Sequence, residues 1–87
     1  PAEAISKIKC PVMALNGTLD LQVLSSDNLP VIKENLPKNK KSVIKEYDNL
    51  NHLFQHCTPT TALNYGAIEE TISEEVLNDI ANWIKAL

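Results

Sequence analysis

The sequence has few of the residues that make cross-links, metal sites or membrane anchors. Its two cysteines, Cys10 and Cys57, stand far apart, and neither belongs to a Cys-x-x-Cys pair. Two isolated cysteines make neither a disulfide framework nor the paired ligands of a zinc site. No apolar run approaches the ~20 residues that span a bilayer. The net charge of −3 offers no basic surface for nucleic acid or anionic lipid. The sequence therefore predicts no zinc site, no nucleic-acid partner and no membrane partner.

Glycine is also scarce, and one of the two glycines closes an apolar run. Gly17 ends "PVMALNG", and a single acid, Asp20, follows three residues later. Residues 11–16 predict a strand. Because the run is continuously apolar rather than alternating, it is typical of a parallel sheet that is covered on both faces. The Asn16-Gly17 pair favours a turn with a positive φ where the strand ends.

A helix and a second strand are predicted next. Residues 27–36 start with capping side chains, Ser26 or Asp27, and present one apolar face made of Leu29, Ile32 and Leu36. We expect the helix to begin near Asp27, because Pro30 is tolerated in a first turn and costly further in. In residues 42–47, Val43, Lys45 and Tyr47 alternate with Ile44 and Glu46, an amphipathic pattern that is typical of a strand near a sheet edge. Together these segments predict a βαβ unit with parallel strands.

The C-terminal part predicts a long loop and then a helix. Residues 49–71 are mostly polar or small, and loops of this length are often functional. In residues 74–87, Ser73 is the predicted cap, and Glu74 and Glu75 suit the positive end of a helix dipole. The apolar stripe of this helix should lie on a sheet and consists of Val76, Ile80, Trp83, Ile84 and Leu87.

The predicted sheet is incomplete by itself. Two strands hardly support a helix on each face, and a first strand that is apolar on both faces requires a further strand beside it. We therefore expect an α/β fold, β-α-β-loop-α with parallel strands, that forms the last two strands and helices of a larger doubly wound sheet. In the chain alone, the exposed edge of the first strand predicts a homo-oligomer formed through that edge.

Two titratable residues follow the two predicted strands. Asp20 comes after the first strand by a tight turn, and His52 comes a few residues after the second. Ligands of open parallel sheets bind beyond the carboxyl ends of the strands, and adjacent strands lie ~5 Å apart. A carboxylate that contacts an imidazole there can fix its tautomer, as in an acid-histidine-nucleophile triad. The order of the acid before the histidine is that of α/β-hydrolases.

Three segments resemble the C-terminal part of the α/β-hydrolase superfamily. "CPVMALNGTLDLQV" is similar to the strand and acid loop late in that fold. "LNHLFQ" is similar to the histidine loop of one esterase branch, and "YGAIEETISEEVLNDIANWI" to its closing loop and helix. The resemblance spans essentially all of residues 1–87 and implies the C-terminal fragment of an α/β-hydrolase domain. It implies hydrolysis of a small carboxylic ester by a Ser-His-Asp triad, with Asp20 as the acid and His52 as the histidine.

The sequence departs from that pattern at two points. Leu24 stands where a proline is frequent, which loosens the start of the following helix without moving Asp20. No Gly-x-Ser-x-Gly occurs among the 87 residues, so the nucleophile is expected upstream and the isolated chain is predicted to be inactive. No metal or organic cofactor is implied.

Other interpretations remain open at this point. A freestanding βαβα interaction module without catalysis would leave Asp20 as a turn residue and His52 as a loop residue. An acyltransferase or a thioesterase would use the same triad with another acceptor or substrate. The neighbouring His56 and Cys57 do not predict a thiol nucleophile, because adjacent loop residues rarely supply an oriented base and an oxyanion pocket.

Overall fold

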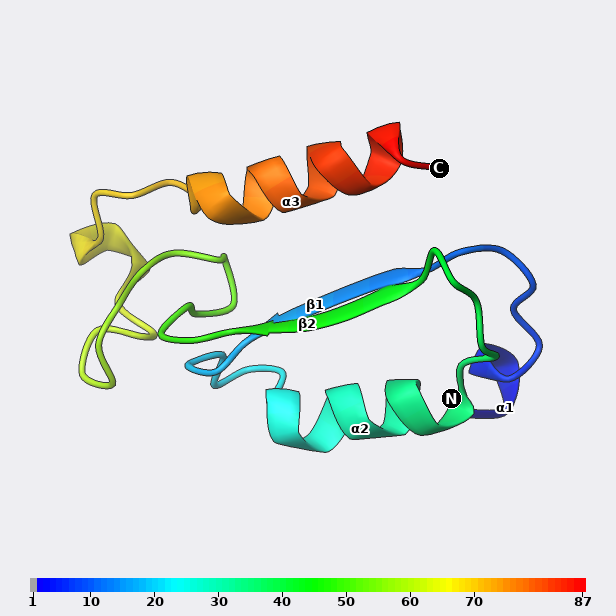
Figure 1. Cartoon of the computed structure of the whole chain (residues 1–87). Coiled ribbons are helices and arrows are strands. Elements are labelled where there is room, and N and C mark those ends of the chain that lie inside the picture. The colour runs from blue at the N-terminus through cyan, green and yellow to red at the C-terminus, as the bar shows by residue number, and fades with distance from the viewer. Residues whose placement is uncertain (1) are drawn as a thin grey trace.

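A two-stranded parallel sheet lies between two helices, so that the molecule has three layers (Figure 1). The structure is a computed structural model that describes residues 2–87. Helix α3 covers one face of the sheet and α2 covers the other (Figure 1). In chain order the elements are α1 (Ala2–Ile5), β1 (Met13–Gly17), α2 (Ser25–Asn35), β2 (Val43–Tyr47), the 3-10 helix η1 (Tyr65–Ala67) and α3 (Glu74–Lys85). The α/β class and the parallel strands are confirmed, whereas α1 was not predicted.

The two strands end at the same edge of the sheet. Met13 of β1 pairs with Val43 of β2, and Gly17 pairs with Tyr47 at the carboxyl ends. Backbone bonds continue beyond the strands, since the Thr18 amide donates to the Tyr47 carbonyl at 2.8 Å. The residues that follow β1 and β2 therefore start side by side.

The alternating side chains of β2 reach opposite layers, as the sequence pattern predicted. Lys45 and Tyr47 contact Asp79 of α3, with Nζ and the hydroxyl 2.8 and 2.6 Å from its Oδ2 atom. Ile44 and Glu46 line a cavity beneath α2 instead. Alternate side chains of β2 therefore face α3 on one side of the sheet and α2 on the other.

Gly17 is required for a close approach and not for a positive φ, which corrects the sequence prediction. Neither glycine in the described part of the chain has a positive φ; that conformation occurs at Asn49 (62°) and Phe54 (57°). A Cβ built on Gly17 would lie 2.1 Å from the carbonyl oxygen of Leu50. A side chain at this position would push β1 away from the segment that leads to His52.

Helix α2 begins earlier than predicted. It starts at Ser25 with Leu24 as the N-cap, and no side chain caps it. Pro30 consequently lies beyond the first turn, where it cannot donate the backbone bond that a helix residue normally makes. The Asp20 carboxylate accepts the backbone amide of Val23 and so orders the chain up to that residue. Helix α2 begins two residues later.

The core lies between the sheet and α3. Its fully buried members are Tyr47, Leu50 and Val76, against which Leu15, Phe54 and Ile80 pack. The predicted stripe of α3 is too long, because Ile84 and Leu87 are 58% and 52% exposed. Two strands ~5 Å apart cover only a narrow band of a helix.

Ser73 is the N-cap residue of α3, as predicted, but its side chain does not cap the helix. The Ser73 Oγ atom is buried without a hydrogen-bond partner in the described structure. The backbone amide of Ser73 donates to the Phe54 carbonyl at 2.7 Å. The start of α3 is therefore tied by its backbone to the segment that contains His52.

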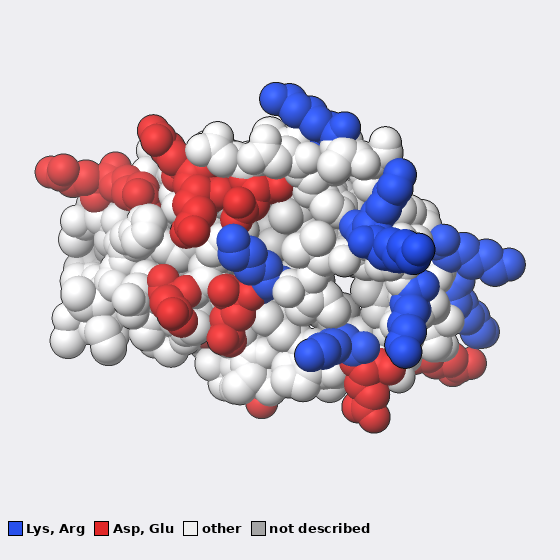
Figure 2. Space-filling model, in the orientation of Figure 1, with Lys and Arg blue, Asp and Glu red and all other residues white. Residues whose placement is uncertain are grey.

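Charge is distributed unevenly over the surface. Acidic side chains gather over the N-terminal half of α3 and the carboxyl ends of the strands, and lysines gather toward the opposite end (Figure 2). None of the helices in residues 2–87 is both long and apolar enough to cross a membrane.

Candidate active site

Asp20 is buried in the turn that follows β1. It is 5% exposed, and its Oδ1 atom accepts the backbone amides of Gln22 and Val23 at 3.0 and 2.8 Å. Its Oδ2 atom accepts the side-chain amide of Asn16 at 3.2 Å, and Asn16 also donates to the Val23 carbonyl at 3.0 Å. We call residues 18–23 the acid turn. Its shape is set by Asp20, around which the backbone folds.

The carboxyl of Asp20 is held in its charged form. Burial raises the pKa of Asp20, but the hydrogen bonds from the Val23 amide, the His52 ring and the Gln22 amide outweigh burial. Together they lower the pKa below its ordinary value of 3.8. A carboxylate offers about four lone-pair sites, and all four are used here. Asp20 is therefore a fixed acceptor and not a proton donor.

His52 lies in a tight turn after β2, which we call the histidine turn (residues 50–56). Leu50 and His56 form an antiparallel bridge at its base, and the Asn51 amide donates to the Gln55 carbonyl at 3.1 Å. Inside the turn, Asn51 Oδ1 accepts the backbone amides of Leu53 and Gln55 at 3.0 and 3.1 Å. Asn51 is 1% exposed, so this side chain is the internal scaffold of the turn.

Phe54 gives the histidine turn its contact with the core. Its backbone has a φ of 57°, which is rare for a bulky residue. The Phe54 ring packs edge-on against Tyr47 with 6.1 Å between centroids. The unusual backbone directs the ring inward, and His52 lies on the outer side of the turn with a half-exposed ring.

The two turns bring Asp20 and His52 into contact. Nδ1 of His52 lies 3.0 Å from Oδ2 of Asp20. Because Asp20 is an acceptor, the neutral His52 ring that this contact favours carries its proton on Nδ1 and leaves Nε2 as the acceptor nitrogen. The side chains are 38% and 6% exposed, respectively, and Nε2 makes no hydrogen bond within residues 2–87. The arrangement is that of an oriented general base that can take a proton from a group at Nε2.

His56 and Cys57, which the sequence did not predict to form a thiol nucleophile and its base, lie outside the Asp20–His52 pair. His56 is exposed and pairs with Glu70, with Nδ1 2.8 Å from Oε1. Burial raises the pKa of the Cys57 thiol, which opposes a thiolate nucleophile. Within residues 2–87 no cluster of His, Cys, Asp and Glu side chains could hold a metal ion.

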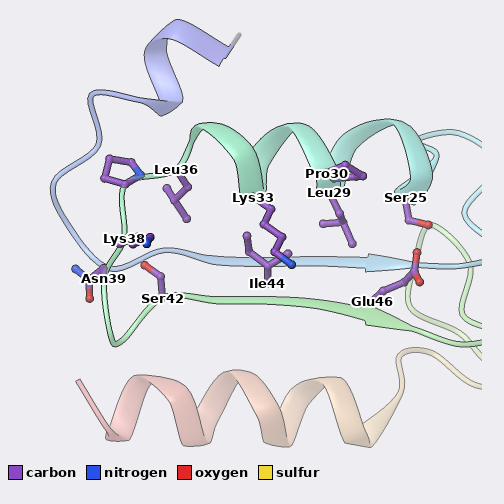
Figure 3. Close-up of a pocket in the computed structure, with 11 residues that line it drawn as sticks. Ser25, Leu29, Pro30, Lys33, Leu36, Lys38, Asn39, Ser42, Ile44 and Glu46 are labelled. Atoms are coloured by element: carbon purple, nitrogen blue, oxygen red, sulfur yellow. The ribbon is translucent and has the colours of Figure 1, made fainter.

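A cavity of about 790 Å³ lies away from this pair, between α2 and β2 (Figure 3). Leu29, Leu36 and Ile44 line it with apolar side chains, and the Lys33 side chain extends toward it from α2 (Figure 3). Neither Asp20 nor His52 lines it, so the cavity does not belong to the candidate site.

Sequence reasoning identified the pair of titratable residues but missed the amides that hold them. Asn16 was taken as part of a turn signal, and no role was predicted for Asn51. The signal that could have found them is closeness in sequence, because Asn16 stands four residues before Asp20 and Asn51 directly before His52.

Comparison with family models, with curated proteins and with solved structures finds no match to this chain.

Proposed function

We propose that the chain is the C-terminal part of a serine hydrolase of the α/β-hydrolase type, which cleaves carboxylic esters. The observation that supports this most is the 3.0 Å contact between His52 Nδ1 and Asp20 Oδ2. The contact lies beyond the carboxyl ends of two adjacent parallel strands, where open α/β sheets bind ligands. The resemblance of the acid and histidine segments to one esterase branch adds to this support.

The proposed proton transfers use the contact between Asp20 and His52. A serine hydroxyl attacks the acyl carbonyl while Nε2 of His52 takes its proton. The imidazolium then returns that proton to the leaving alcohol, and water repeats the sequence on the acyl-enzyme. Asp20 keeps the proton on Nδ1 and stabilises the imidazolium. Its low pKa suits this role, because a neutral acid there would give less stabilisation.

The serine in this proposal comes from a segment outside the 87 residues. No Gly-x-Ser-x-Gly is present in them, and only β2 pairs with β1 in the described structure. A further parallel strand on the outer edge of β1 would carry the nucleophile to the same end of the sheet. Residues 1–87 are then one part of a larger doubly wound domain.

The surroundings of the pair favour an uncharged substrate. Leu21 and Leu53, the residues directly after Asp20 and His52, are 49% and 45% exposed. Acidic side chains gather at this end of the molecule on the face shown in Figure 2. Apolar contacts suit an acyl chain, and the negative surface disfavours an anionic substrate. A neutral carboxylic ester meets both conditions.

The test is ester hydrolysis by the full-length protein that contains this chain, with p-nitrophenyl acetate and butyrate as probes. We expect His52→Gln and Asp20→Asn to lower kcat by about 10⁴-fold or more, and the control Asn82→Ala, at an exposed position of α3, to leave it nearly unchanged. Equal activity of the His52→Gln variant would overturn the proposal. If the acyl-enzyme forms but passes its acyl group to an added alcohol rather than to water, the protein is an acyltransferase with the same triad.

A further inference from the structure

The loop between the histidine turn and α3, residues 57–72, is fastened to both turns of the site. At the acid turn, the side-chain amide of Gln22 donates to the hydroxyl of Tyr65. At the histidine turn, Glu70 Oε1 accepts the backbone amide of His56 at 2.7 Å and faces His56 Nδ1 at 2.8 Å. We call residues 57–72 the strap loop, because it crosses from one turn to the other.

Each fastening point is joined to the reacting pair by a short run of backbone. Gln22 uses its side chain for Tyr65 and its own backbone amide for Asp20, at 3.0 Å. His56 forms the base of the histidine turn through its bridge to Leu50. A movement of the strap loop would therefore be passed to Asp20 through Gln22 and to His52 through the base of its turn.

Apart from the Asp20–His52 contact itself, the bonds from the acid turn to β2 and to the segment after β2 lie at the inner ends of the two turns. The amides of Thr18 and Leu19 donate to the carbonyls of Tyr47 and Leu50 at 2.8 and 3.0 Å. These contacts fix where the turns begin, next to the sheet. The His52 side chain lies at the outer end and is 38% exposed, so packing alone does not hold it against Asp20.

We propose that Tyr65 and Glu70 are positioning residues, which hold the acid turn and the histidine turn so that His52 Nδ1 stays within hydrogen-bond reach of Asp20. The catalytic consequence rests on the proposed function. The contact itself can be measured without catalysis. Small displacements of such a pair matter, because proton transfer requires a geometry held within about 0.5 Å.

The test reads the tautomer of His52 in the chain labelled with ¹⁵N-histidine, at a pH where both rings are neutral. The chain has two histidines, so His52→Gln assigns both signals. In the wild-type chain we expect His52 to carry its proton on Nδ1, facing Asp20. Tyr65→Phe and Glu70→Ala should each lower the ratio of the Nδ1–H to the Nε2–H form by about fivefold, the effect of one ordinary hydrogen bond. Glu70→Gln, which keeps a carbonyl acceptor, should fall between wild type and Glu70→Ala.

Two matched variants separate positioning from general loss of stability. Tyr47→Phe removes a hydroxyl that contacts Asp79 and not the strap loop, and Glu69→Ala removes a neighbouring carboxylate. Both should leave the His52 tautomer unchanged, even where Tyr47→Phe lowers the unfolding midpoint more than Tyr65→Phe. A tautomer ratio that follows stability across all variants would overturn the inference, as would no change in Tyr65→Phe and Glu70→Ala.

The same spectra keep this inference apart from the proposed function. A wild-type His52 that carries its proton on Nε2 would contradict the oriented base and hence the proposed function. A wild-type Nδ1–H form that persists in every variant would leave the proposed function standing and remove the role of the strap loop.

Discussion

Gly17 and Leu50 lie so close that no other residue than glycine fits at position 17. A Cβ there would lie 2.1 Å from the Leu50 carbonyl oxygen and 2.7 Å from its carbonyl carbon. Leu50 begins the histidine turn, and its carbonyl accepts the Leu19 amide from the acid turn at 3.0 Å. The closeness of the two turns, and with it the Asp20–His52 contact, depends on this glycine.

Gly17→Ala should therefore be strongly destabilising. The added methyl meets backbone rather than a side chain that could move, so we expect a loss of about 1–3 kcal/mol of unfolding free energy, the range for overpacked positions. Urea unfolding followed by circular dichroism measures this. Gly66→Ala is the matched control, since its Cβ would meet nothing within 4 Å, and it should be neutral or slightly stabilising. Equal stability of the two variants would contradict the close approach.

Asn51→Ala should loosen the histidine turn from inside. It removes the oxygen that accepts the amides of Leu53 and Gln55, and leaves both donors, of which that of Gln55 is buried, without this partner. We expect a loss of about 1–3 kcal/mol and faster hydrogen exchange of the two amides. Asn82→Ala, at an exposed position of α3, is the control and should change little. Unchanged exchange at Leu53 and Gln55 would show that Asn51 does not support the turn.

The stability of the chain should depend on the protonation of Asp20 at low pH. The pKa of Asp20 is lower in the folded chain than its ordinary value of 3.8. Its contribution to stability is therefore complete above pH 3.8 and is lost as the pH falls through the folded pKa. Urea unfolding between pH 7 and pH 2 should show this decrease, and Asp20→Asn should make it shallower. Some decrease should remain in that variant, because the pKa values of Glu70 and Asp79 are lowered too. An identical pH dependence in both proteins would contradict the buried, charged acid.

The chain alone should associate through the outer edge of β1. The Val12 carbonyl and the Thr18 amide both point to β2, and backbone groups alternate along a strand. Those of Met13 and Leu15 therefore face outward. We expect a dimer in light scattering at micromolar concentration, and Met13→Pro, which blocks the outer edge, should shift it toward monomer. A stable wild-type monomer would disprove this association.

The sequence was sufficient to predict the fold class and the partnership of Asp20 with His52. Both depend on local patterns, namely one apolar and one amphipathic strand segment that each end in a turn, and a histidine one βαβ unit after the acid. The start of α2 was predicted two residues late, because Pro30 was expected in the first turn, whereas it lies further inside the helix. The helical stripe was overestimated at Ile84, since periodicity gives the face of a helix but not the width of the sheet beneath it.

The supporting residues could not be predicted for a related reason. Asn51 satisfies two backbone amides of a turn whose shape is unknown until the chain folds. The Gln22–Tyr65 bond joins residues 43 positions apart, and no local pattern links them. Gly17 was recognised as unusual, but its reason, a backbone carbonyl from the second turn, lies in the three-dimensional structure.

Labelling of the full-length protein with a fluorophosphonate probe tests the central proposal most directly. The account predicts one labelled serine upstream of Pro1, within a Gly-x-Ser-x-Gly segment, and labelling that is almost lost in His52→Gln and retained in Asn82→Ala. Absence of any labelled serine, or labelling that is indifferent to His52, would contradict a Ser-His-Asp triad built on Asp20 and His52.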